Sequence, residues 1–557
     1  MKCLPRRTLS IISCLLVNVA VFAQKAEVPK GWHLMDQGET GFYGISMDKA
    51  YEFVKSKELK STPVIVAVID SGVDTLHEDL KSILWHNTKE IPGNGIDDDK
   101  NGYVDDVYGW NFLGGRDGSN VEKDSYEAAR IYHKFKSKWG DKPVAKSSLT
   151  AADLKEFEMW EKAKEDIIGD INPLDVLQAR KMFKDIKAGD SIIAKDLGKE
   201  EYNGKDLADY TPTEDAAKRV KRILMTICKA NDNDEISNQM ILDELEGDIS
   251  KFEAAERAPK AYRNDVVKDN YNDLNDKFYG NSNVMVSKSS ALHGTHVSGI
   301  IGAVRNNGVG MDGVADNVRI MSVRAVPDGD EHDKDIALAI HYAVDNGAKV
   351  INMSFGKGLS PEKKWVDEAV KYAESKGVLL VHAAGNSHQN LDTTLNFPTA
   401  VYEDGARASN WITVGASGDP KAGGYTASFS NYGKKEVDVF APGVKIYSTV
   451  PGGNTYQFLQ GTSMAAPVVT GLAAFILEYY PNLTPAQVKS IIEKSSRKPG
   501  EKVKDPGTGE DVDLSDLSVS GGLINAYEAI KLASTMKTET KQKVAPTKSK
   551  VKQKKRD

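Results

Sequence analysis

Three short motifs place a serine, a histidine and an aspartate where they could together activate a nucleophile. The motifs are Asp70-Ser-Gly, His293-Gly-Thr-His-Val-Ser-Gly and Gly-Thr-Ser463-Met-Ala-Ala-Pro. A serine hydroxyl is a weak nucleophile at neutral pH, so it needs a base to accept its proton and a third group to orient that base. Asp70, His293 and Ser463 are the residue types that this chemistry requires.

Each of these residues has a simpler interpretation when it is taken alone. Asp70 could be a turn residue after a strand, and His293 and Ser463 could each cap a helix. His296 follows His293 at a spacing that two zinc ligands can have, but no third ligand is near, so we expect it to be a packed neighbour. Only the three motifs in this order favour catalysis.

The order of the motifs and the sequence Gly461-Thr-Ser-Met-Ala-Ala-Pro467 resemble the subtilisin-like serine proteases, also called subtilases or peptidase family S8. The segments 352–356 (Asn-Met-Ser-Phe-Gly) and 383–386 (Ala-Ala-Gly-Asn) support the resemblance, which covers roughly 43–117 and 285–533. It implies a subtilisin-type fold and a serine endopeptidase that hydrolyses peptide bonds through an acyl-enzyme. It also implies protein or peptide substrates and no cofactor for catalysis.

The resemblance assigns roles to individual residues. Ser463 would attack the scissile carbonyl, His293 would act as base and then as acid, and Asp70 would orient the imidazole. Asn386 would donate its side-chain amide to the oxyanion, together with the backbone N–H of Ser463. The substrate-binding residues would be Ser354, Phe355, Gly356, Ala384 and Gly385.

The elements that would position these residues are strands alternating with helices. The apolar runs are rich in β-branched residues, which is typical of strands buried on both faces of a parallel sheet. Helical patterns cover 335–345 and 361–376, and Gly377 ends the second. The sequence predicts an α/β fold, a doubly wound parallel sheet in three layers with the site at the carboxyl ends of its strands. The predicted strands are 64–69, 318–323, 350–353, 378–383 and 411–414.

Residues 118–285 interrupt this pattern and place Asp70 and His293 223 positions apart. The segment is charged and contains apolar stripes at helical spacing, and Thr150 with Asp153 resembles a capping box. We expect an inserted, mainly helical subdomain beside the cleft. It could be a lid, a substrate selector or an internal folding aid, or it could simply stabilise the domain.

An acidic loop is a candidate cation site. Asp97, Asp99 and Asn101 alternate before Gly102, which permits a sharp turn. Calcium requires several oxygen ligands, including backbone carbonyls such as that of Tyr103. We expect a structural calcium ion held by Asp97, Asp99, Asn101, Tyr103 and Asp106, and the alternative is a solvated acidic turn. A second, weaker candidate is Asp79 with the loop 305–311.

The two ends of the chain differ from its body. Residues 1–23 carry basic residues before an apolar stretch of 15 residues, which is typical of a secretory signal peptide cleaved near Ala23. A short segment, 24–42, precedes the first part of the expected catalytic domain, 43–117. Residues 286–534 form the second catalytic part, and the lysine-rich tail 535–557 is expected to be disordered.

Composition limits the remaining possibilities. A net charge of −7 argues against a nucleic-acid binder, and three cysteines exclude a disulfide scaffold. We expect no apolar run to span a membrane, since the stretch that ends at Ala23 is shorter than the roughly 20 residues that a membrane helix needs. The sequence therefore predicts a secreted monomer, periplasmic or extracellular. The alternatives are a catalytically silent binding protein with the subtilase fold and a calcium-dependent surface protein.

Overall fold

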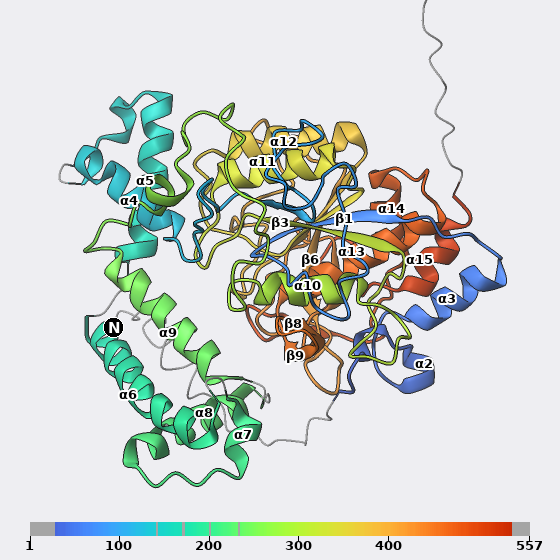
Figure 1. Cartoon of the computed structure of the whole chain (residues 1–557), viewed down its shortest axis with the longest axis horizontal. Coiled ribbons are helices and arrows are strands. Elements are labelled where there is room, and N and C mark those ends of the chain that lie inside the picture. The colour runs from blue at the N-terminus through green and yellow to red at the C-terminus, as the bar shows by residue number, and fades with distance from the viewer. Residues whose placement is uncertain are drawn as a thin grey trace, which may run out of the picture.

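The computed structural model describes residues 28–536, apart from 141–142, 170–172, 200–201, 232–233 and 235. The predicted signal peptide and the tail from Lys537 onward lie outside these residues. Seven parallel strands form the central sheet, in the order β2-β3-β1-β4-β5-β6-β7 (Figure 1). Their bounds are β1 Val64–Asp70, β2 Gly109–Asn111, β3 Val318–Arg324, β4 Val350–Met353, β5 Leu379–Ala383, β6 Trp411–Ser417 and β7 Val439–Pro442.

Helices cover both faces of the sheet, which confirms the predicted doubly wound α/β architecture. Val66 and Val68 of β1 belong to one buried cluster, and Ala67 and Ile69 belong to another, because side chains alternate along a strand. The first cluster includes α3 Met47–Ser56, α10 Leu292–Gly302, α13 Thr462–Tyr479, α14 Pro485–Ser495 and α15 Ala526–Ala533. The second includes α11 Asp333–Asp345 and α12 Lys363–Lys376.

Helix α13 is long and apolar enough to cross a membrane by length and composition, which the sequence analysis did not anticipate. It has 18 residues, and 89% of them are buried inside the protein. It packs against β4, β5, β6 and β7 in the core. These contacts identify α13 as a core helix of the α/β domain.

The five predicted strands and both predicted helices are present, with ends that differ by at most three residues. Gly377 ends α12 with φ 72°, a left-handed conformation that favours glycine. The short strands β2 and β7 were not predicted. A hairpin, β8 Ile446–Val450 and β9 Thr455–Leu459, leads into α13. The remaining small elements are η1 Trp32–Leu34, α2 Gln37–Thr40, β10 Val503–Lys504, β11 Asp511–Val512 and η4 Leu514–Asp516.

Between β2 and α10 the chain is mainly helical, as expected, and forms two groups (Figure 1). In the first, α4 Glu127–Trp139 and α5 Ala151–Ile168 pack through Trp139, Phe157 and Trp160. Thr150 caps α5 by accepting a hydrogen bond from the Asp153 N–H. The second, called here the α6–α9 group, contains α6 Pro173–Leu197, α7 Gly204–Ala208, α8 Asp215–Asn231 and α9 Asn238–Glu253. Two short turns complete the segment, η2 Lys146–Ser148 and η3 Arg263–Val267.

Candidate active site

Asp70 and His293 meet at the carboxyl edge of the sheet. Asp70 is the last residue of β1 and its side chain is 3% exposed, whereas His293 lies in the first turn of α10 and is 36% exposed. Nδ1 of His293 lies 2.8 Å from Oδ1 of Asp70. Gly294 makes this approach possible, because a Cβ there would clash with the carbonyl oxygen of Gly72.

The carboxylate of Asp70 changes the proton affinity of His293. Burial alone would lower the pKa of His293, but the charge of Asp70 and the hydrogen bond to it outweigh burial and raise this pKa above its ordinary value. A contact through Nδ1 also leaves Nε2 as the nitrogen that can exchange a proton with a third group.

Ser463 lies in the first turn of α13, beside the end of β4. Its Oγ donates a hydrogen bond to the carbonyl oxygen of Ser354 at 3.1 Å, and the Oγ of Ser354 donates to the carbonyl oxygen of Ser463 at 2.9 Å. Among the described residues, Ser463 Oγ has no hydrogen bond to His293. The structure therefore brings Asp70 and His293 into direct contact and places Ser463 against Ser354.

A buried chain of hydrogen bonds fixes Ser354 relative to α13. Thr470 donates to Asn352 at 2.8 Å, and Asn352 donates to the Oγ of Ser354 at 2.9 Å. All three side chains are nearly inaccessible to solvent. Since buried polar groups are costly unless paired, this chain specifies one alignment of β4 and α13.

Asn386 is held with its amide nitrogen available. Its Oδ1 accepts hydrogen bonds from both the N–H and the Oγ1 of Thr462, each at 2.9 Å. Gly461 has φ 149°, and a Cβ there would lie 3.3 Å from Nδ2 of Asn386. The Nδ2 donor thus lies beside the backbone that leads into Ser463. Thr462 was not singled out from the sequence, although it stands within the motif of Ser463.

The loop after β5 is held by residues that the sequence analysis missed. Asn431 donates to the carbonyl oxygen of Ala384 at 2.8 Å, and the N–H of Gly385 donates to Oγ1 of Thr462 at 3.0 Å. Asn396 also donates to Ala384, at 3.1 Å. No local pattern indicates these contacts, because Asn431 comes from the loop after β6 and Asn396 stands twelve residues after Ala384 in the loop after β5.

A buried ionic cluster joins α4 to the segment after β4. Phe355 and Gly356 precede Lys357, whose ammonium lies 2.7 Å from the carboxylate of Glu127 and 2.8 Å from that of Asp333. Burial alone would lower the pKa of Lys357, but Asp333 and Glu127 outweigh it and raise this pKa. The helical segment is therefore anchored beside the predicted substrate-binding residues.

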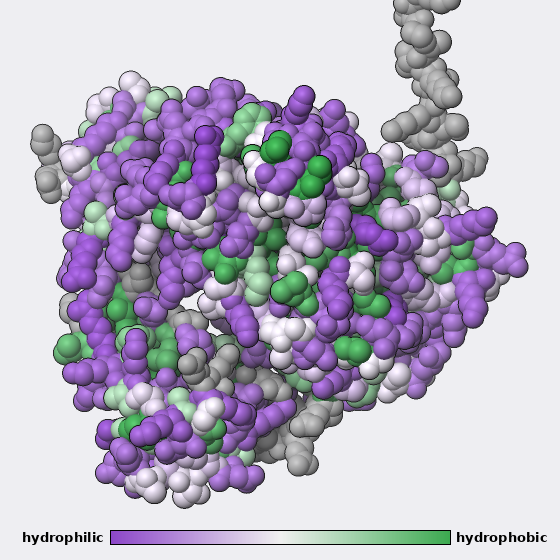
Figure 2. Space-filling model, in the orientation of Figure 1, coloured by the Kyte–Doolittle hydropathy of each residue, from purple (hydrophilic) through white to green (hydrophobic). Residues whose placement is uncertain are grey.

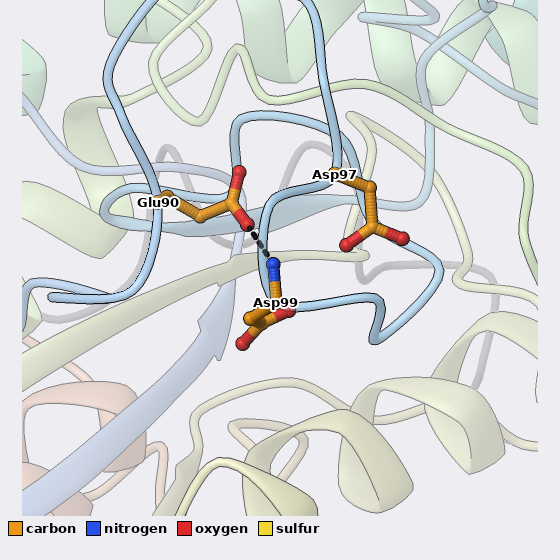
Figure 3. Close-up of side chains that lie close together, drawn as sticks. All are labelled: Glu90, Asp97 and Asp99. Carbon is orange, nitrogen blue, oxygen red and sulfur yellow. Dashed lines mark hydrogen bonds between the residues drawn. The ribbon is translucent and has the colours of Figure 1, made fainter.

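The acidic loop between β1 and β2 brings three carboxylates together (Figure 3). Ligand oxygens of Glu90, Asp97 and Asp99 all lie within 4.8 Å of one another. Glu90 is 6% exposed, and one of its oxygens accepts the N–H of Asp99 at 3.1 Å. Glu90 was not predicted as a ligand, because it lies outside the alternating pattern.

Of the other residues predicted for the cation site, Asn101 donates its backbone N–H to Asp97 at 3.0 Å and to Asp99 at 3.1 Å, whereas Asp106 has different partners. Asp106 is buried and accepts hydrogen bonds from Asn87 at 2.7 Å, Asn101 at 3.0 Å and Tyr342 at 2.7 Å. Burial raises the pKa of Asp106 to about 6, although these hydrogen bonds oppose the change. The ring of Tyr103 is buried among aromatic side chains. The Asp106 carboxylate is thus outside the group formed by Glu90, Asp97 and Asp99.

Asp79, the carboxylate of the second candidate cation site, forms hydrogen bonds with other side chains of the protein. Asp79 is fully buried, and its carboxylate accepts hydrogen bonds from Asn307 at 2.5 Å and Tyr456 at 3.2 Å. The loop 305–311 therefore does lie against Asp79, as expected.

The structure places an aspartate–histidine pair and a serine at the carboxyl edge of a parallel sheet. This arrangement is typical of serine proteases with an α/β fold. The chain belongs to the subtilase family, which residues 61–515 match. Thermophilic serine proteinase of Bacillus sp. (strain AK1) is 41% identical over 239 residues, which are 43% of this chain and 52% of that protein. Subtilisin DY of Bacillus licheniformis is 40% identical over 213 residues, 38% of this chain and 72% of that protein. The chain thus matches about half the length of the first relative.

Proposed function

We propose that the protein is a serine endopeptidase that cleaves polypeptides with Ser463 as its nucleophile. The observation that carries the proposal is the 2.8 Å contact between His293 and Asp70, at the edge where Ser463 lies in the first turn of α13. Family membership supports the same assignment. Ser354, Phe355, Gly356, Ala384 and Gly385 remain the proposed substrate-binding residues.

The proposed mechanism uses each group in turn. Ser463 exchanges its bond with Ser354 for one with Nε2 of His293, gives up its proton and attacks the carbonyl carbon. Nδ2 of Asn386 and the N–H of Ser463 stabilise the oxyanion. His293 then gives the proton to the leaving amine, which leaves an acyl group on Ser463 that water hydrolyses. Asp70 stabilises the imidazolium formed in both steps.

Labelling with a fluorophosphonate tests the assignment without knowledge of the substrate. We expect the probe to modify Ser463, as identified by mass mapping of the labelled peptide, because only an activated serine reacts rapidly. Labelling should disappear in His293→Ala, which retains Ser463 but lacks the base. Absence of labelling in the folded protein would favour the catalytically silent binding protein.

Substitution of Asn386 by leucine should lower kcat by about 10²–10³, the loss found when this donor is removed from a subtilisin. KM should change little, because the donor acts on charge that develops only in the transition state. Steady-state kinetics on a peptide substrate measures both constants. An unchanged kcat would show that Asn386 does not contact the oxyanion.

We further propose that Glu90, Asp97 and Asp99 hold a calcium ion that fixes the acidic loop. Three converging carboxylates repel one another, and a cation bound between them would remove this repulsion. Calcium at about 100 times its Kd should stabilise the protein by about 2.7 kcal/mol, measured as a higher Tm than in a chelator. Asp99→Asn should remove this difference, whereas Asp209→Asn, an exposed residue outside the cluster, should retain it. An equal calcium effect in both variants would contradict the site.

We also propose that the protein is exported after cleavage near Ala23, because residues 1–23 have the composition of a signal peptide. Amino-terminal sequencing of protein recovered from outside the cytoplasm should then begin at Gln24. A chain that retains its first residues in that fraction would contradict cleavage.

A further inference from the structure

A strongly basic groove lies between the α6–α9 group and the hairpin β8–β9. The cavity has a volume of about 1270 Å³. Figure 1 shows α7 and α8 on the side of the molecule where β8 and β9 lie, although the two parts are far apart in the sequence. Among the described lining residues, Asp234 is the one acid, and the basic ones are Lys30, Lys205, Lys218, Lys221, Arg222, Lys229 and Lys445.

Helix α8 presents its basic residues to the groove because its apolar face is used elsewhere. Ala217, Val220 and Leu224 are buried in the core of the α6–α9 group. Lys218, Arg222 and Lys229 stand at i, i+4 and i+11, so they share another face of the helix. Packing of the apolar face therefore fixes the direction of the positive charges.

This positive charge is only partly compensated by the protein. Within the part of the chain that the structure describes, the side chains of Arg222 and Lys229 make no hydrogen bond or ion pair. Lys221 donates to the carbonyl oxygens of Ala208 and Tyr210, which do not neutralise it. Lys218 is paired with Asp215 at 3.0 Å, which reduces the repulsion between Lys218 and Arg222, like charges four residues apart that disfavour the helix. An anionic ligand would remove this repulsion, and the groove stands out in a chain of net charge −7.

The groove lies close to the proposed nucleophile. Phe458 lines it from β9 and stands five residues before Ser463. Five residues span at most about 18 Å, so a polypeptide bound at Ser463 reaches the groove within a few residues. Met225, Tyr210 and Phe458 add apolar surface that can accept side chains.

We propose that this groove is an exosite that binds an acidic stretch of a polypeptide substrate while another part of the same chain occupies the active site. The proposal rests on the proposed protease function. A polypeptide is favoured over other polyanions because the groove adjoins a site that acts on polypeptides. The exosite would select substrates by carboxylates at a distance from the cleaved bond.

Binding is tested first, in a form that does not require catalysis. A fluorescent ten-residue glutamate peptide is titrated into the full chain carrying Ser463→Ala, and anisotropy gives Kd. We expect Arg222→Glu with Lys229→Glu to raise Kd at least about tenfold, and added salt to weaken binding. The matched control is Lys181→Glu with Lys184→Glu, two exposed lysines of α6 outside the groove, which should leave Kd within about twofold.

Catalysis is tested second, with one cleavable neutral peptide made with and without a glutamate extension. The extension should lower KM at least about fivefold in the unmodified protein and have no effect in the Arg222→Glu, Lys229→Glu variant, which should cleave the short peptide normally. Equal Kd values in both variants, or tighter binding of an oligonucleotide than of the acidic peptide, would overturn the exosite. Charge-dependent binding without any cleavage would instead contradict the protease assignment alone.

Discussion

Replacement of Ser463 by alanine is expected to lower kcat for peptide hydrolysis by about 10⁶-fold, the size of effect found for the nucleophile of a subtilisin. The variant lacks the atom that forms the acyl-enzyme, so only oxyanion stabilisation and binding remain. Because Ser463 is within α13 and makes its other contacts through its backbone and Ser354, we expect the fold and Tm to be retained. The measurement is the rate of peptide cleavage at saturating substrate.

A double variant provides the control for this result. His293→Ala alone should cost about as much as Ser463→Ala, and the two together should cost no more than either one, because they act as one unit. Losses that multiply in the double variant would mean that His293 and Ser463 act independently. That outcome would contradict the proposed triad.

Substitution of Asp70 by asparagine should lower kcat by about 10⁴-fold and move the acid limb of the pH profile to lower pH. In the unmodified protein Asp70 raises the pKa of His293, so the protonated, inactive form persists to a higher pH than for an ordinary histidine. Without that charge, burial dominates and lowers the pKa. The activity that remains should therefore survive to more acidic pH.

The measurement for Asp70→Asn is kcat/KM as a function of pH, which reports groups of the free enzyme. Substitution of Asp74, a nearby buried aspartate that instead accepts the N–H of Gly452, serves as a comparison. We expect Asp74→Asn to leave the position of the acid limb unchanged. An acid limb that Asp70→Asn does not move would show that another group controls it.

The sequence predicted those parts of the fold that local patterns determine. Val64–Ile69 and Val350–Met353 are continuous apolar runs, and they became the neighbouring strands β1 and β4. Strand β2 has only three residues and β7 only four, the last of them proline, so neither shows a recognisable run. These short strands form because their neighbours β3 and β6 offer backbone partners.

The site shows the same division between local and tertiary information. The motifs supplied Asp70, His293 and Ser463, and the structure places the first two in contact. Glu90 escaped notice because it stands outside the alternating pattern of its own loop, and Asn431 because its partner Ala384 lies in another loop, so only folding brings these groups together. The apolar stripes of 118–285 predicted helices but not their division into two groups, which depends on which stripes pack together.

The ionic contacts of Lys357 make the helical segment difficult to remove cleanly. Excision of residues 118–285 would take away Glu127 and leave the ammonium with Asp333, beside Glu331, whose pKa burial already raises to about 8. Breaking a buried ion pair costs about 3–5 kcal/mol, a large share of the stability of a typical domain. A poor yield of a truncated protein would therefore report a broken buried ion pair as readily as a lost folding aid. A minimal catalytic unit should carry Lys357→Met together with Asp333→Asn, so that neither partner is left as an unpaired buried charge.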